Sequence, residues 1–121
     1  MIGLDLTEVE RIERALERRP RLAERLFQPG EIAYARSRRR PAVHLAARFA
    51  AKEAALKALG ENRIALREIE VEGGGSEPPR IRLHGAAAEL ATARGLVLDV
   101  SLTHTHAHAA AVVQARSATP S

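Results

Sequence analysis

The chain has 121 residues, of which 45% are hydrophobic and 28% are charged, the balance expected of one globular domain. The absence of cysteine excludes disulfide scaffolds, thiolate metal sites and cysteine nucleophiles. The net charge of +4 comes from the first half of the chain, where residues 1–60 hold 13 Lys and Arg against 8 Asp and Glu, so an acidic partner would meet that half.

The first half predicts a strand followed by helices. A short strand is expected over residues 2–6, and Thr7 with Glu10 forms a capping box for a helix that ends at Pro20. A shorter helix is predicted over residues 29–37.

The strongest helix is predicted over residues 41–60. Its first residue is Pro41, typical of a first helical turn, and Gly60 stands where a glycine commonly ends a helix. Both terminal signals therefore agree on its bounds.

From Arg63 onward, apolar residues recur mainly at the two-residue spacing of strands. The predicted elements are a hairpin over residues 66–83 with residues 73–79 as its connection, a helix over 86–93 stopped by Gly95, strands over 96–102 and 107–114, and a frayed tail over 117–121. The pattern shows no repeat and no domain boundary. It predicts an α+β fold in a single domain over residues 1–116.

The residues of this chain also exclude several classes of partner. No apolar run approaches the ~20 residues of a membrane span, and the first residues lack the basic and apolar regions of a leader, so we expect a soluble, cytoplasmic protein with no membrane partner. Nucleic acid is disfavoured because proteins that bind single strands need stacking rings, and this chain has only Phe27, Tyr34 and Phe49.

Charges interrupt the apolar face of the helix over residues 41–60. On a helical wheel, Glu53 and Lys57 occupy the middle of that face. Buried charges are costly, so the two residues either form a buried ion pair or serve a site. Arg48 and Lys52 lie to the side at i,i+4, where like charges repel unless an anion such as a phosphate joins them.

A run of histidines near the end of the chain has two interpretations. His104, His106 and His108 share one face if the segment is extended, and they would then either bind a transition metal or form a polar face. The neighbouring hydroxyl residues favour His104 as a contact to phosphate or hydroxyl. At the other end of the chain, Asp5 closes the first strand, and together with Glu53 it supplies the carboxylates that Mg²⁺ prefers.

Three segments together resemble the holo-[acyl-carrier-protein] synthase family, the small 4′-phosphopantetheinyl transferases. They are GLDLTEVERI over residues 3–12, RFAAKEA over 48–54 with KALG over 57–60, and VSLTHT over 100–105. The resemblance spans nearly the whole chain in the order of the family, and the RFAAKEA segment is very specific.

The resemblance implies a fold, an activity and an assembly. The fold is that of the 4′-phosphopantetheinyl transferases, with one long central helix packed on a mainly antiparallel sheet. The activity is transfer of the 4′-phosphopantetheine group from coenzyme A to a serine of an acidic apo acyl carrier protein, with Mg²⁺ required and adenosine 3′,5′-bisphosphate released. The assembly is a homotrimer whose active sites lie between neighbouring subunits.

The resemblance also implies roles for individual residues. Asp5 and Glu53 match the metal ligands, and Glu53 and Lys57 match the catalytic positions. The positions expected around coenzyme A are Arg48, Lys52, Lys57, Gly60, Ser101, His104 and Thr105. The arginines expected to dock the carrier protein are Arg11, Arg14, Arg18, Arg21 and Arg25.

These roles suit phosphoryl transfer, which needs a positioned nucleophile and neutralised phosphate charge. Glu53 would deprotonate the serine either directly or through a metal-bound water, and Lys57 would offset charge on the leaving phosphate. The alternative from another class is a non-catalytic metal-binding module that uses His104, His106 and His108.

Overall fold

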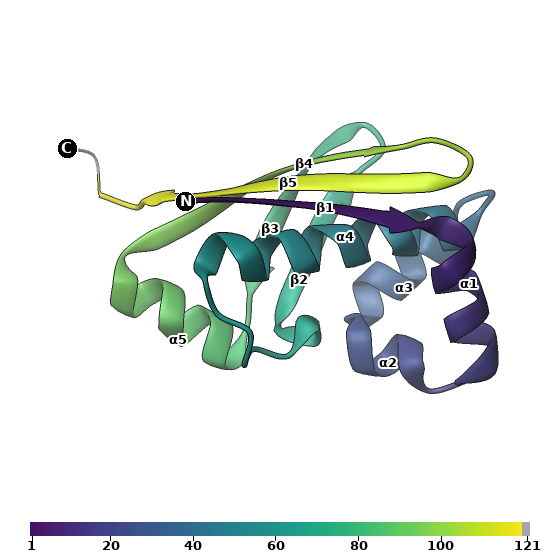
Figure 1. The fold of residues 1–121 in the computed structure, drawn as a ribbon, viewed down its shortest axis with the longest axis horizontal. Helices are drawn as coiled ribbons and strands as arrows, with labels where there is room; N and C mark the ends of the chain where they lie inside the picture. Colours follow the sequence, from purple (N-terminus) through teal and green to yellow (C-terminus); the bar gives the residue numbers. More distant parts are fainter. Residues whose placement is uncertain (120–121) are drawn as a thin grey trace.

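The computed structural model describes residues 1–119, which form five strands, five α-helices and one short 3₁₀ helix (Figure 1). The first half contains β1 (Ile2–Glu8), α1 (Val9–Arg18), α2 (Leu22–Leu26), α3 (Pro29–Arg36) and α4 (Pro41–Leu59). The second half contains η1 (Leu66–Glu68), β2 (Ile69–Gly74), β3 (Glu77–Leu83), α5 (Gly85–Arg94), β4 (Leu96–His104) and β5 (His108–Ser117). The predicted α+β class is therefore confirmed.

The strands form two antiparallel sheets. β1, β5 and β4 make a three-stranded sheet in that order, with β1 and β4 at its edges, while β2 and β3 form a separate hairpin. In Figure 1 the three-stranded sheet lies above α4, and the other helices lie on the side of α4 away from that sheet. Within residues 1–119, no helix combines the length and the apolar character that crossing a membrane requires.

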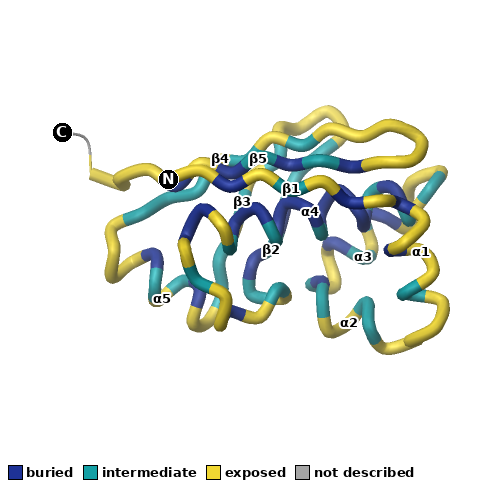
Figure 2. The backbone as a smooth tube through the Cα atoms, viewed as in Figure 1, coloured by how far each residue is buried: buried dark blue, intermediate teal, exposed yellow. Residues whose placement is uncertain are grey.

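The core is built around α4, whose buried side chains are mostly alanines. The buried alanines of this helix are Ala46, Ala47, Ala50, Ala51, Ala54, Ala55 and Ala58. Figure 2 shows this burial as a dark band along α4 and the strand residues that face it. Small side chains let the strands approach the helix closely, and this close approach compensates for the scarcity of aromatic rings in the chain.

Gly3 is the position at which β1 presses hardest on α4. A Cβ atom there would overlap the carbonyl oxygen of Ala54, so only glycine fits. Side chains alternate along a strand, and therefore Gly3 and Asp5 both face α4 while Leu4 points to solvent. The close approach at Gly3 thus brings Asp5 against the second half of the helix.

Most predicted elements are confirmed with shifts of a few residues. The 41–60 helix ends as expected, because Gly60 takes the left-handed conformation with φ 66°. The hairpin differs in its connection: β2 and β3 extend into the glycine-rich segment and leave only Gly75 and Ser76 as the turn. α2 was not predicted, since five residues are too few to show a helical period.

The predicted capping box at Thr7 and Glu10 is wrong. Thr7 belongs to β1, its hydroxyl donates to Asp5 Oδ2 at 2.8 Å, and α1 has no side-chain cap. The predicted tail is also partly wrong, because β5 continues through Ser117 and the Ala118 amide donates to the Gly95 carbonyl at 2.8 Å. Residues 120–121 of that tail lie outside the described residues.

Replacing Gly3 tests the close packing of β1 on α4. Gly3→Ala is expected to lower the free energy of unfolding by about 3 kcal/mol, because the new methyl group overlaps helix backbone that cannot move aside. Urea unfolding followed by circular dichroism measures this loss. The matched control is Gly30→Ala, at an exposed position of α3 where a Cβ atom makes an ordinary contact of 3.5 Å with the Glu70 side chain, and it should leave stability unchanged or raise it by up to ~1 kcal/mol. Equal stability of the two variants would contradict the packing argument.

Candidate functional site

Asp5 and Lys57 meet where β1 lies against the last turns of α4. Lys57 Nζ donates to the Leu4 carbonyl at 2.8 Å and lies 3.4 Å from Asp5 Oδ1. The Lys57 side chain is 57% exposed, whereas that of Asp5 is 18% exposed. The Thr7 hydroxyl holds the second carboxylate oxygen of Asp5. Asp5 is therefore oriented by its own strand, and Lys57 presents an ammonium to solvent beside it.

Glu53 lies one helical turn before Lys57 and is half-buried. Within residues 1–119, no hydrogen bond or ion pair engages its carboxylate, and the partner of Lys57 is Asp5. The interpretation of Glu53 and Lys57 as a buried ion pair is therefore wrong. The reason is that β1 covers this face of α4 only in part, so that Lys57 reaches solvent past the strand.

The chemistry of this group fits a hard cation such as Mg²⁺. Mg²⁺ takes oxygen ligands and is commonly held by one or two carboxylates, with waters and substrate phosphates completing its shell. Asp5 and Glu53 are two carboxylates of this kind at one edge of the fold. No cluster of three or more His, Asp or Glu side chains suited to a metal occurs in the described part of the chain, so these residues do not form an all-protein metal cage.

The histidine run does not form a metal site. β4 ends at His104 and β5 begins at His108, so the three histidines do not line one strand. His106 lies in the turn between the strands, where Arg40 Nη1 donates to its carbonyl at 3.0 Å and lies 3.1 Å from its Nδ1. The expectation of one shared face is therefore wrong, because a hairpin turn interrupts the alternation at His106.

Lys52 is the fully buried charge of α4. Its ammonium lies 2.7 Å from Glu31 Oε1 and donates to the carbonyls of Leu66 and Ile69. Burial lowers the pKa of Lys52, and the carboxylate of Glu31 opposes that shift. The anion beside Lys52 is thus a carboxylate of this chain rather than the phosphate that the like-charge argument expected. The wheel also misjudged this side of α4, which α3 and β2 cover.

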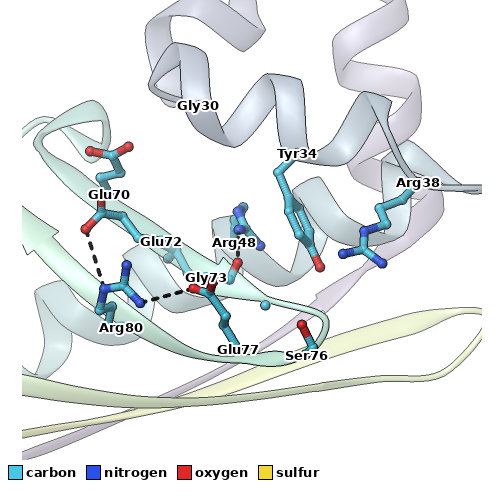
Figure 3. A pocket seen from close by; sticks show the side chains of 12 residues that line it. Gly30, Tyr34, Arg38, Arg48, Glu70, Glu72, Gly73, Ser76, Glu77 and Arg80 are labelled. Atoms are coloured by element: carbon cyan, nitrogen blue, oxygen red, sulfur yellow. Dashed lines mark hydrogen bonds and ion pairs between the residues drawn. The ribbon is translucent and has the colours of Figure 1, made fainter.

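Arg48 forms the floor of a hollow between α3, α4 and the β2–β3 hairpin. Its side chain is almost entirely buried, its Nη2 donates to the Gly73 carbonyl at 2.8 Å, and its guanidinium stacks 4.1 Å from the centre of the Tyr34 ring. Arg38 stacks on the same ring at 4.6 Å. Figure 3 shows that the ring of Tyr34 lies between the two guanidinium groups. Burial lowers the pKa of Arg48, but an arginine stays charged at neutral pH.

The carboxylates around this hollow are paired, whereas its two stacked arginines are not. Glu72 and Glu77 lie within 3.8 Å and 3.6 Å of Arg80, as the dashed lines in Figure 3 show. Neither Arg38 nor Arg48 takes part in an ion pair within residues 1–119. The hollow, of about 460 Å³, is lined by three arginines and three glutamates, and its positive charge is concentrated at the side of Arg38 and Arg48, which would suit an anionic ligand.

A second hollow of about 320 Å³ continues from Tyr34 to the edge strand β4 and is lined by His44 and His104. The two imidazole rings meet edge to face at 5.6 Å. Partial burial lowers the pKa of His44, and the neighbouring His104, Arg38 and Arg48 lower it further. These neighbours disfavour the protonated form of His44, whereas a bound anion would favour it.

Asp5 and His104 mark opposite edges of the three-stranded sheet. Asp5 lies on β1 and His104 on β4, with β5 between them. We call the group Asp5, Glu53 and Lys57 the carboxylate half, and the group Tyr34, Arg38, His44, Arg48 and His104 the basic half. The two halves belong to separate edges of one chain.

The other residues predicted around coenzyme A are dispersed. Gly60 caps α4 beside the side chain of Met1. Ser101 pairs with Val112 on the face of β4 opposite to that of His104, because side chains alternate along the strand. The Thr105 hydroxyl accepts hydrogen bonds from the amides of Ala107 and His108 and so closes the β4–β5 turn.

The predicted docking arginines are all exposed. Arg11, Arg14 and Arg18 lie on α1, and Arg14 pairs with Glu10 at 2.6 Å. Arg21 precedes α2 and Arg25 lies near its end. Arg19, Arg21 and Arg25 surround Leu22 in a shallow hollow, so this end of the molecule combines positive charge with an apolar side chain.

Sequence reasoning missed Glu31, Tyr34, Arg38 and His44. The scarcity of rings singled out Tyr34, and the Arg38–Arg40 run was visible, but α3 and the segment after it have no sequence signal that aims them at Arg48. Their convergence depends on how α3 crosses α4, which only the packed fold shows.

Comparison with known proteins gives one family. The model of the 4′-phosphopantetheinyl transferase superfamily matches residues 1–113. Holo-[acyl-carrier-protein] synthase of Moorella thermoacetica is 46% identical over 118 residues, covering 95% of this chain and 92% of that protein. The protein of the same name from Streptomyces coelicolor is 47% identical over 116 residues, covering 93% of each chain.

Solved structures agree with this result. Holo-[acyl-carrier-protein] synthase of Neisseria meningitidis matches with a TM-score of 0.86 at 27% identity, covering 95% of this chain and 96% of that one. The Helicobacter pylori protein, solved in complex with coenzyme A, matches with a TM-score of 0.82 at 28% identity, covering 96% and 100%. The fold implied by the resemblance is therefore confirmed, and the chain belongs to the holo-[acyl-carrier-protein] synthase family of the 4′-phosphopantetheinyl transferase superfamily.

Proposed function

We propose that this protein transfers the 4′-phosphopantetheine group of coenzyme A to a serine of apo acyl carrier protein and releases adenosine 3′,5′-bisphosphate. The family of the chain supports this activity. The observation that assigns this activity to particular residues is the contact of Lys57 with Asp5. Glu53 lies one helical turn before Lys57, and its carboxylate has no partner within residues 1–119.

In this reaction the serine oxygen forms a bond to the phosphorus of the pantetheine phosphate while the pyrophosphate bond to the leaving nucleotide breaks. Glu53, whose carboxylate has no partner within residues 1–119, would accept the serine proton. Lys57 offsets the charge that builds on the leaving phosphate. Asp5 and Glu53 would hold Mg²⁺, which would supply charge neutralisation at the phosphate groups.

The nucleotide end of coenzyme A fits the basic half. Arg38, His44, Arg48 and His104 line two joined hollows in which no carboxylate pairs with either stacked arginine among the described residues. Phosphate groups favour such sites because guanidinium groups donate hydrogen bonds in pairs. Lys52 differs from these residues, because its ammonium donates its hydrogen bonds to Glu31 and to backbone carbonyl groups inside the protein.

Neighbouring copies would bring the two halves together. They lie at opposite edges of the sheet, so contact of the β1 edge of one copy with the β4 edge of the next would join them head to tail, and such contacts form a ring where the rotation between copies closes. The outer face of β1 supplies an apolar surface for this contact, because Ile2, Leu4 and Leu6 are each about two-thirds exposed. We propose a ring of three subunits, as the family resemblance implies.

The exposed arginines of α1 and α2 suit an acidic carrier protein. Positive charge at this end of the molecule speeds the encounter with a negatively charged partner, and dissolved salt screens that attraction. Leu22 adds an apolar contact among Arg19, Arg21 and Arg25.

A carrier modification assay tests the activity and its metal requirement. Purified protein, coenzyme A, Mg²⁺ and apo carrier are expected to give carrier heavier by one phosphopantetheine, and EDTA should abolish the gain. Glu53→Gln should slow transfer by at least about 100-fold while the protein stays folded, because proton acceptance is lost. Glu89→Gln, at an exposed position of α5, is the matched control and should transfer normally. A failure to modify any carrier tested by mass spectrometry would refute the proposal.

Mixing two inactive variants tests the shared site. Glu53→Gln removes the carboxylate half, and Arg38→Ala/His104→Ala removes exposed residues of the basic half. After dissociation and reassembly together, about one quarter of the sites should combine two intact halves, and transfer should return to that extent. If each site were built within one chain, the mixture would stay as inactive as its components.

Reversing charge on the docking face tests the carrier contact. Arg18→Glu/Arg21→Glu should raise the KM for carrier roughly tenfold at low salt and less at high salt, because the attraction becomes repulsion. The KM for coenzyme A should not change. Glu17→Arg on the same helix is the opposite change and should lower the KM for carrier; an equal KM in both variants would contradict this role.

A further inference from the structure

The Glu31–Lys52 pair stands out among the ion pairs of residues 1–119 because both of its side chains are fully buried. Taking two charges out of water is costly, and apolar residues of similar volume often stabilise a core equally well. Neither charge faces the carboxylate half or lines the hollows of the basic half. The pair therefore calls for a role other than contact with a ligand.

The pair ties three segments together through directional contacts. Glu31, on α3, accepts from Lys52 of α4 through Oε1 at 2.7 Å and from the Val71 amide of β2 through Oε2 at 3.0 Å. Lys52 donates in turn to the carbonyl of Ile69, at the start of β2, and to that of Leu66, in η1, at 3.1 Å. Hydrogen bonds with fixed geometry on both charged groups set the position of α3, α4 and β2 relative to one another.

The same three segments supply the groups that meet at Arg48. Arg48 precedes Lys52 by one helical turn on the same side of α4. Tyr34 follows Glu31 by three residues on α3, and Gly73, whose carbonyl accepts from Arg48, follows Val71 by two residues on β2. Each segment that contacts the pair thus also carries Arg48 or one of its two partners, at most one helical turn or two strand residues away.

Arg48 makes few directional contacts of its own, although its side chain is buried. The Gly73 carbonyl is the hydrogen-bond acceptor of its guanidinium, and its buried Nε has no partner among the described residues. The ring of Tyr34 stacks on the same guanidinium group. Because Gly73 lies on the hairpin and Tyr34 on α3, a shift of either segment would displace the guanidinium or break its contact with that segment.

We propose that the Glu31–Lys52 pair is a positioning pair: it holds Arg48, Tyr34 and Gly73 in register and thereby sets the affinity of the basic half for its anionic ligand. It leaves chemistry at the carboxylate half unaffected. The identity of the ligand as coenzyme A rests on the proposed function, whereas the register of Arg48 and Tyr34 does not.

The chain carries its own probe of this register. It has one tyrosine and no tryptophan, so the near-ultraviolet circular dichroism and intrinsic fluorescence of the protein are dominated by Tyr34. Because two guanidinium groups stack on that ring, these spectra respond to movement of Arg48 or Arg38 without any ligand present.

The test removes both charges while preserving volume. Glu31→Gln/Lys52→Met is expected to fold, to raise the KM for coenzyme A about tenfold, to change kcat less than threefold, and to alter the Tyr34 spectra without ligand. Glu31→Asp keeps the charge but shortens the arm, and it is expected to raise the KM about threefold with a smaller spectral change. This variant provides the test if the double variant does not fold.

Val113→Ala is the matched control, because it opens the buried core between β5 and α4 without removing a hydrogen bond of the Glu31–Lys52 pair. It should lower thermal stability while leaving the KM for coenzyme A and the Tyr34 spectra unchanged. The proposal is overturned if a folded pair variant keeps the wild-type KM and spectra, or if Val113→Ala changes them equally. If the wild type transfers nothing, the proposed function fails, and the spectra alone still decide whether the pair fixes the register.

Discussion

The packing of α4 is the constraint on which the rest of this structure depends. β1, β4 and β5 pack on one side of the helix, and α1, α3 and β2 pack on others. So many neighbours fit because the buried positions of α4 are largely alanine, and β1 comes closest where Gly3 has no side chain. A helix enclosed in this way exposes few of its side chains to solvent. Each charged residue on it therefore depends on the neighbours that surround it.

Three environments on one helix separate three roles. Lys57 reaches solvent past the edge of β1 and contacts Asp5. Lys52 is fully buried beneath α3 and β2. Arg48 is buried as well, but it lines a hollow. The two lysines of α4, Lys52 and Lys57, therefore differ in their surroundings. Lys57 is available to a ligand, whereas Lys52 serves the internal arrangement of the fold, since its hydrogen bonds are all made inside the protein.

The division of the site between two sheet edges links fold to assembly. Strand order β1-β5-β4 keeps Asp5 and His104 on different edges, and no rearrangement within one chain removes the strand between them. An exposed apolar row on β1 accompanies the carboxylate half. In the proposed ring, association would cover the apolar row and would place the carboxylate half of one copy beside the basic half of the next.

The sequence by itself determined the α+β class, the long helix with its Pro41 and Gly60 ends, and the family, through the RFAAKEA segment and its companions. These depend on local patterns of residues, which are legible without coordinates. The cap at Thr7, the shared face of the histidines and the surroundings of Lys52 were misjudged. Each of them depends on a strand extension, a turn or a covering element that brings distant residues together.

Only the tertiary structure therefore decided that Glu31 pairs with Lys52, that Tyr34 stacks on Arg48, and that Asp5 and His104 lie at opposite edges of the sheet. A helical wheel assigns one buried face to α4, but the packed fold covers the helix on several sides at once. The physical reason is that burial is a property of the neighbours of a side chain, and those neighbours come from segments far away in the sequence.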